Sequence, residues 1–399
     1  MNPWPLARAA LVRRWRGAAT MAALIAIAVG LGIGVGVLDR GSRRAAARAA
    51  DAFDLVVGAP GGPAQLVFAA VYLQPDAVPL LEPAVVRQVL EEREASWVSP
   101  VGFGDSWQGH PVVGVAPAFI GRAGTQTLAE GRPFAADEEA VAGSGVPLAI
   151  GAAVSPTHGL IATQGAHVHT EAAYRIVGRL PPTGTRWDQA ILVPIESVWA
   201  LHGLGNGHPP GVERIGPPWE QPAGVPAIVV KPRSIAGAYQ LRARYRTASS
   251  TAVFPGEVLS GLFRTLGDVR SVLSGMATLT MGLVVAAVFL AFAALVAGRA
   301  RDHAVLRAIG APLLFVVAAL WLELGMILLA GVSGGVLLGW AAGAWAGSFL
   351  GRATGVAITV TPGWQELSLA LGTLVAALAA AAIPALLGGR AAPAALLKR

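Results

Sequence analysis

Hydrophobic residues are concentrated in four long runs separated by polar segments. Residues 17–38 contain no charged residue, and a helix of that length is about 33 Å long, enough to cross the hydrocarbon core of a bilayer. Residues 272–298 and 367–388 are also free of charge, whereas residues 312–349 contain one ionisable side chain, Glu323. The pattern predicts a membrane protein with four transmembrane α-helices at these positions.

Two of the runs allow more than one interpretation. Residues 312–349 exceed the length that a bilayer requires, so this helix must tilt, extend beyond the membrane or bend at its glycines, Gly331, Gly334, Gly335 and Gly339. Residues 17–38 follow several arginines and precede Ala47-Arg48-Ala49, as a cleavable signal peptide would. A signal peptide has a shorter apolar core of about 7–15 residues, so we favour a retained anchor.

The long polar insert, residues 39–271, alternates between the patterns of strands and helices. We expect a mixed α/β domain outside the cytoplasm, with a helix at Pro83–Trp97. The predicted strands are Phe53–Val57, Pro111–Val115, Tyr174–Gly178, Ala190–Val193 and Ala227–Val230. From Pro255, apolar residues recur every three or four positions without a breaker until Gly298. One continuous helix of about 66 Å is therefore predicted, and its first part must stand outside the membrane as a stalk.

Composition narrows the class of protein further. Of the 399 residues, 54% are hydrophobic and 13% are charged, about half of the charge of an ordinary soluble domain. Such a chain is neither a purely soluble protein nor disordered. It contains no cysteine, which excludes disulfides, cysteine-ligated zinc and iron–sulfur clusters.

The distribution of basic residues predicts the orientation of the chain. Arginines are enriched in residues 1–16, in the loop 299–311 and, with Lys398, in the tail 389–399, but are sparse in the loop 350–366. By the positive-inside rule, both termini and the loop 299–311 lie in the cytoplasm, and the loop 350–366 lies outside. The net charge of +7 therefore marks the cytoplasmic side and does not indicate nucleic-acid binding.

No catalytic motif accompanies this topology. The sequence contains no phosphate-binding loop, zinc-protease motif or nucleophile elbow, so we expect a non-catalytic subunit that binds no ATP itself. Five histidines in the insert are candidate ligands of a metal such as zinc: His158, His167, His169, His202 and His208. Unless they converge in space, they are exposed histidines in polar loops.

Glu323 is the one acid within a predicted span. An intramembrane acid indicates function by default, but a hydrogen bond between helices is the structural alternative that we favour here. The glycines and alanines of the spans predict close packing of helices.

The segment Arg299–Ala311 reads RARDHAVLRAIGA, and Leu322-Glu323 and Gly334-Gly335 follow it. This order resembles the FtsX-like domain of MacB-type ABC transporter permeases, although His303 stands where that family often has an acid nearby. The tail with Pro384 and Pro393 is similar to that of the family. In the insert, Glu130–Phe134, Glu139–Gly145 and Tyr174–Gly178 resemble pieces of the MacB periplasmic core.

The resemblance implies a bacterial inner-membrane permease that works as a homodimer with a separate ABC ATPase, which binds the ATP and Mg²⁺. The loop 299–311 would then be a coupling helix, and its charged residues would contact the ATPase: Arg299, Arg301, Asp302 and Arg307. ATP hydrolysis would move the outer domain for export or release of a peptide, lipoprotein or other periplasmic substrate, together with a periplasmic partner or substrate-binding protein. Alternatives are a component of a zinc-related ABC system and a membrane-anchored sensor without an ATPase.

Overall fold

The computed structural model describes residues 2–74, 78–122, 126–158, 167–168, 173–298 and 300–389. The chain forms two compact units. We call residues 1–42, 266–350 and 358–399 the helical unit, and residues 43–265 with 351–357 the sheet unit. Two helices, α2 (Trp15–Asp51) and α8 (Pro255–Gly298), contribute residues to both units.

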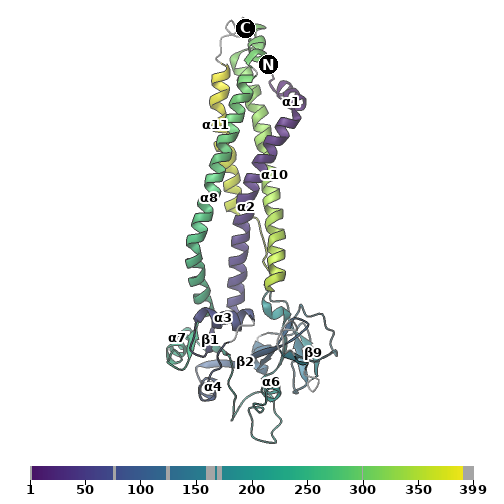
Figure 1. The fold of residues 1–399 in the computed structure, drawn as a ribbon, viewed down its shortest axis with the longest axis vertical. Coiled ribbons are helices and arrows are strands. Elements are labelled where there is room, and N and C mark those ends of the chain that lie inside the picture. Colours follow the sequence, from purple (N-terminus) through teal and green to yellow (C-terminus); the bar gives the residue numbers. More distant parts are fainter. Residues whose placement is uncertain are drawn as a thin grey trace. The chain divides into compact units, whose positions relative to one another are not determined.

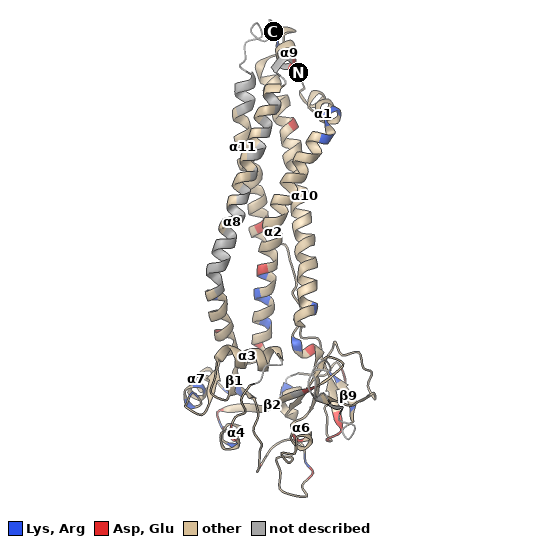
Figure 2. Ribbon diagram, viewed as in Figure 1, with Lys and Arg blue, Asp and Glu red and all other residues tan. Residues whose placement is uncertain are grey.

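The helical unit contains α1 (Trp4–Arg13), α9 (Ala300–Ala308), α10 (Leu313–Thr354) and α11 (Trp364–Gly389), besides its parts of α2 and α8. Figure 2 shows long uncharged stretches of α2 and α10. Among the described residues, three helical segments are long and apolar enough to cross a membrane: α2, α10 and residues 364–383 of α11. The fourth predicted span, 272–298, lies within α8, where many side chains are outside the described part, so the four-span count stays a prediction.

Two predictions about long helices are settled by the backbone. The helix α8 runs without a break over 44 residues from Pro255 to Gly298, as the periodicity predicted. The helix α10 is likewise one continuous element of 42 residues, so its glycines do not interrupt it. Figure 1 shows both as long unbroken ribbons.

The glycines of α10 form the contact with α2. A Cβ atom on Gly335 would lie 2.7 Å from Val29 Cβ, and one on Gly339 would lie 2.5 Å from the carbonyl oxygen of Gly30. Neither distance is physically tolerable, so only glycine allows the two backbones to approach this closely. Close helix packing, which the composition of the spans predicted, is thus confirmed for this helix pair.

The sheet unit is built on a mixed sheet whose main strand order is β12-β1-β11-β2-β3-β10-β5-β9-β4. Parallel pairing occurs between β10 and β3 and between β5 and β9, and the other pairs are antiparallel. The strands of this path are β1 (Leu55–Gly58), β2 (Ala95–Trp107), β3 (His110–Val115), β4 (Glu130–Gly131), β5 (Glu139–Ala142), β9 (Tyr174–Arg179), β10 (Ile191–Pro194), β11 (Ala227–Pro232) and β12 (Thr251–Val253). Three short strands extend it: β6 (Ala153–Val154), β7 (Thr157–His158) and β8 (His167–Val168).

Helices cover both faces of this sheet. Leu55 and Val57 point to one face and pack with apolar residues of α4 (Pro83–Leu90), α6 (Ile195–Leu201) and α7 (Ile235–Arg244). Val56 points to the other face, with α3 (Pro63–Tyr72), α5 (Pro117–Ile120) and Trp187 of the short 3₁₀ helix η2 (Arg186–Gln189). Because both faces are covered, the central strands are apolar at consecutive positions.

The predicted strands at Phe53–Val57, Pro111–Val115, Tyr174–Gly178, Ala190–Val193 and Ala227–Val230 are confirmed within two residues at either end. The helix predicted at Pro83–Trp97 is wrong in its second half, because α4 ends at Leu90 and β2 begins at Ala95. Residues of β2 pair with β11 on one side and with β3 on the other. Backbone pairing with two neighbours outweighs the helical periodicity of the sequence here.

Candidate coupling site

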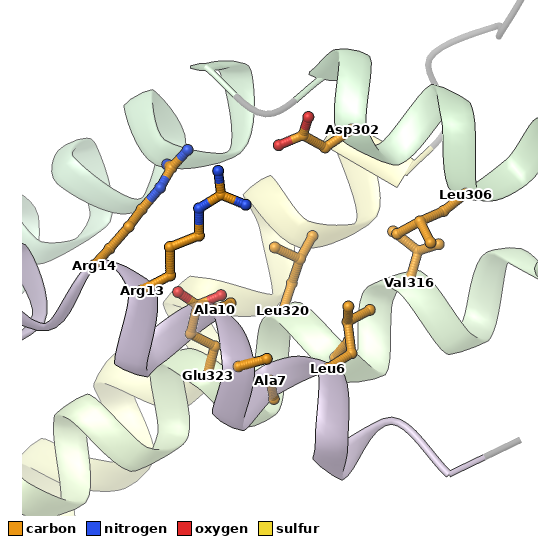
Figure 3. A pocket seen from close by; sticks show the side chains of 12 residues that line it. Leu6, Ala7, Ala10, Arg13, Arg14, Asp302, Leu306, Val316, Leu320 and Glu323 are labelled. Carbon is orange, nitrogen blue, oxygen red and sulfur yellow. The ribbon is translucent and has the colours of Figure 1, made fainter.

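A cavity of about 450 Å³ lies within the helical unit, between α1, α9 and α10. Leu306, Val316 and Leu320 give it an apolar wall. Four charged residues also line it: Arg13, Arg14, Asp302 and Glu323. Figure 3 shows the guanidinium groups of Arg13 and Arg14 on the same side of the cavity as the Asp302 carboxylate, with Glu323 below Ala10.

The turn between α9 and α10 follows from its sequence, Ile309-Gly310-Ala311-Pro312. Gly310 adopts a positive φ of 96°, which glycine tolerates. The amide of Ala311 donates to the Leu306 carbonyl at 3.0 Å, and that of Gly310 donates to the Arg307 carbonyl at 3.1 Å. These two bonds form a Schellman motif, which ends α9 after Ala308 and lets α10 begin directly after Pro312. The turn therefore fixes α9 tightly to the start of α10.

The cavity brings together two of the residues singled out from the sequence. Asp302 is exposed on α9, whereas Glu323 is 5% exposed on α10. Arg307 belongs to α9 but does not line the cavity. Arg299 lies outside the described residues, as does the side chain of Arg301. Two basic and two acidic side chains therefore line the same cavity.

The sequence predicts a basic segment at Arg13 and Arg14, either facing the cytoplasm or opening a signal peptide, but no site at these residues. Ala7 of α1 is 1% exposed, while Trp4 and Val12 are exposed. The segment thus has one packed face, and its arginines reach the cavity from the end of the helix. The available signal was the short basic helix, initiated by Pro5, ahead of the first span.

The helical unit also contains an ion pair between Arg40 of α2 and Glu366 of α11. The two side chains are 18% and 9% exposed. Arg40 also donates to Gln365 Oε1 at 3.3 Å, and Glu366 Oε2 accepts from the Gly363 amide at 2.9 Å. Nothing in the sequence connected these residues, which are more than 300 positions apart.

A second cavity, of about 350 Å³, lies in the sheet unit near α4 and α7. Burial acts to raise the pKa of the Glu92 carboxyl, but donors outweigh it and hold the pKa below its usual range. These donors are Arg244 Nη1 at 2.6 Å and the Tyr245 hydroxyl at 2.8 Å. The Glu92 carboxylate is thus occupied by hydrogen bonds from its own neighbours. These bonds join the segment after α4 to the end of α7, which is a structural role.

The candidate metal ligands fall into separate groups. His208 has a fully buried side chain, with Nδ1 3.3 Å from Glu220 Oε2 and Nε2 3.9 Å from Glu196 Oε1. The predicted alternative, an exposed histidine in a polar loop, is therefore wrong for His208. Burial raises the pKa of Glu196, which accepts from the Gly216 amide and the Trp219 indole.

The other histidines lie elsewhere. His202 follows α6 and faces Asp105, whereas His158 and His167 occupy β7 and β8 with side chains outside the described part. His169 lies wholly outside it. Within the side chains that the structure describes, no three His, Asp or Glu residues form a group that could hold a metal ion.

Comparisons with known proteins find a family similarity in the C-terminal part of the chain. No curated protein matches the sequence. Among solved structures, the periplasmic region of MacB from Actinobacillus actinomycetemcomitans aligns at 9% identity with a TM-score of 0.30, covering 53% of this chain and 94% of that one. The extracellular domain of the noncanonic ABC-type transporter YknZ from Gram-positive bacteria aligns at 8% identity with a TM-score of 0.30, covering 50% and 98%. The family model described as FtsX-like permease C-terminal matches residues 274–393, which confirms the resemblance predicted from the loop and tail and, with the apolar helices, indicates a membrane protein.

Proposed function

We propose that this chain is the membrane subunit of an ABC transporter of the MacB/FtsX type, which works with a separate ATPase. The FtsX-like permease domain at residues 274–393 carries the proposal. The absence of a phosphate-binding loop from the sequence agrees with it, because ATP and Mg²⁺ would then be bound by the partner.

In this proposal α9 is the coupling helix. Arg299, Arg301, Asp302 and Arg307 would present charges to the ATPase, and the Schellman turn would pass a displacement of α9 directly to α10. The cavity supports this role, since Asp302 on α9 shares it with Glu323 on α10 and with the two arginines at the end of α1. A movement of α9 therefore changes an electrostatic environment that three helices share.

The continuous helix α8 supplies the other half of the mechanism. It ends at Gly298, directly before α9 begins at Ala300, and its first turn starts at Pro255 in the sheet unit. A helix about 66 Å long can carry a displacement over that distance as a rigid element. ATP hydrolysis would thereby move the outer domain, without any need for a polar path through the bilayer.

The remaining assignments follow from this proposal. The protein would lie in the bacterial inner membrane as a homodimer on two ATPases, with both termini and the loop 299–311 in the cytoplasm. Four spans at 17–38, 272–298, 312–349 and 367–388 would flank the outer domain, residues 39–271. The substrate would be a peptide, a lipoprotein or another periplasmic molecule, met from the outer side.

The coupling role predicts that charge reversal on α9 separates the permease from its ATPase. We expect Arg301→Glu combined with Arg307→Glu to abolish copurification of the ATPase from membranes and the ATP hydrolysis of the complex. Arg246→Glu is the matched control, because it reverses the charge of an exposed arginine in the sheet unit. Normal membrane insertion of both variants, checked by yield and protease accessibility, separates coupling from folding. Undiminished copurification of the double variant would contradict the proposal.

A further inference from the structure

The cavity between α1, α9 and α10 has a charged side and an apolar side. Figure 3 shows the guanidinium groups of Arg13 and Arg14 and the carboxylate of Asp302 toward one side, and Leu306 and Val316 toward the other. Its volume of about 450 Å³ falls in the range of small-molecule sites, about 300–1,000 Å³. The cavity therefore suits a ligand that is itself charged at one end and apolar at the other.

The end of α1 directs two consecutive arginines into this cavity. In a continuous helix, neighbouring side chains point about 100° apart. The helix α1 ends at Arg13, however, and Arg14 leaves the helical conformation with φ −121° and ψ 32°. Both side chains thereby line the same cavity, and neither pairs with an acid that the structure describes. A guanidinium presents a planar fork of donors that matches the oxygens of a phosphate, so the pair suits a phosphate group.

The sequence around the cavity indicates that it lies at the depth of lipid headgroups. Both arginines lie within four residues of the charge-free run 17–38, and Asp302 lies four residues after the charge-free run 272–298. Trp4 and Trp15 are 48% and 62% exposed, and tryptophan is enriched where a membrane meets water. The phosphates of a phospholipid occupy this level of a bilayer, and its acyl chains begin directly below.

We propose that this cavity binds one phospholipid whose headgroup carries a primary ammonium, such as phosphatidylethanolamine. Arg13 and Arg14 hold the phosphate, Asp302 accepts hydrogen bonds from the ammonium, and the first part of an acyl chain lies against Leu306 and Val316. Basic pockets between transmembrane helices are known to bind lipid headgroups. The acid adds selectivity, because it repels a headgroup that has only negative charge.

The bound lipid would connect two helices. Its phosphate is held from the end of α1, whereas its ammonium is held from α9. This role goes beyond the proposed coupling to an ATPase and does not depend on it.

Lipid binding is measured by native mass spectrometry on the full chain, purified in detergent and freed of phospholipid. Titration with phosphatidylethanolamine is expected to give one tightly bound lipid per chain, with weaker binding of phosphatidylglycerol. Arg13→Gln combined with Arg14→Gln should weaken the binding of phosphatidylethanolamine about tenfold or more, because charge-assisted hydrogen bonds to the phosphate are lost. Asp302→Asn should weaken phosphatidylethanolamine and strengthen phosphatidylglycerol.

Arg8→Gln is the matched control for either single variant, Arg13→Gln or Arg14→Gln. Arg8 is an exposed arginine of the same helix, but it does not line the cavity. Its replacement removes the same charge and should leave the affinity for phosphatidylethanolamine unchanged. Without lipid, the melting temperatures of all the arginine variants should equal that of the parent, since these side chains are exposed.

Equal affinity of the double variant and the parent, or an equal loss in Arg8→Gln, would overturn the site. Glycerophosphoethanolamine, which has the headgroup without acyl chains, distinguishes a lipid from a soluble phosphate. It should not displace the lipid at equal concentration, and displacement would overturn the assignment of a lipid. Because no ATPase is present, failure here leaves the proposed coupling function untouched, and failure of the coupling experiment leaves the lipid site untouched.

Discussion

The helices α10 and α8 are similar in length, 42 and 44 residues, but their glycines have opposite surroundings. A Cβ atom on Gly331, Gly335, Gly339 or Gly343 of α10 would meet atoms of α2 within 3.0 Å. At Gly256, Gly261, Gly275, Gly282 and Gly298 of α8, a Cβ atom would meet nothing within 4 Å among the described residues. Glycine content alone therefore does not show which helix is tightly packed.

Spacing explains the difference. The four glycines of α10 recur every four residues and so lie along one face of the helix. The residues of α2 that meet them, Ile25, Val29, Ile33 and Val37, have the same spacing. Branched side chains of one helix thus fit against a smooth ridge of the other, as in packing of i±4 ridges into grooves. The described glycines of α8 do not recur every four residues: Gly261, Gly275 and Gly282 share a face but lie several turns apart, so they form no continuous ridge.

The largest effect that this comparison predicts is at Gly339. In Gly339→Leu, the new Cβ atom would lie 2.5 Å from the Gly30 carbonyl oxygen and 2.9 Å from Ile33 Cβ, so α2 and α10 must separate. Overpacking a core costs about 1–3 kcal/mol, and more when backbone must move. We expect the upper end or beyond, measured as loss of monodisperse protein in detergent and a fall in melting temperature.

Gly282→Leu on α8 is the matched control, since it adds the same side chain where nothing is within 4 Å. Its yield and melting temperature should stay close to those of the parent chain. Equal damage from both substitutions would show that the two helices do not differ in packing.

A smaller effect tests what an ion pair adds to the packing of α2 against the glycine face. The Arg40–Glu366 ion pair connects α2 to α11 near the first turn of α11. Removal of one partner of a fully buried pair costs about 3–5 kcal/mol. Because Arg40 is 18% exposed, we expect Arg40→Ala to cost roughly 1–3 kcal/mol, measured by unfolding in detergent.

A double-mutant cycle with Glu366→Gln isolates the pair from other losses. The combined variant should be destabilised by less than the sum of the two single variants. Additive losses would show that the two side chains do not stabilise each other.

Local pattern could predict the elements whose own residues carry the periodicity of a helix or a buried strand. The uninterrupted apolar periodicity after Pro255 predicted α8 to its last residue, and runs such as Ala227–Val230 predicted buried strands. Such local patterns do not predict which distant segments pair with each other. Nothing in Ala95–Trp107 marks it as the strand between β11 and β3, and nothing in the sequence places Asp105 opposite His158.

The candidate coupling site shows the same limit. Asp302 and Glu323 could be singled out by residue type and position, because one follows a span and the other interrupts one. That they share a cavity with Arg13 and Arg14 depends on how α1 folds back against α9 and α10. Only tertiary structure determines that contact.

The smallest predicted effect is also the most sensitive to the surroundings of α8. Gly282→Ala adds one methyl group, and replacing a glycine within a helix by alanine stabilises it by roughly 0.5–1 kcal/mol. With open space around Gly282, the melting temperature should rise slightly, whereas Gly335→Ala, which would meet Val29 Cβ at 2.7 Å, should lower it. The sign of the change in melting temperature for Gly282→Ala is therefore the informative quantity. A lowered melting temperature there would mean that a second chain packs against this face of α8, so that α8, too, depends on close approach at a glycine.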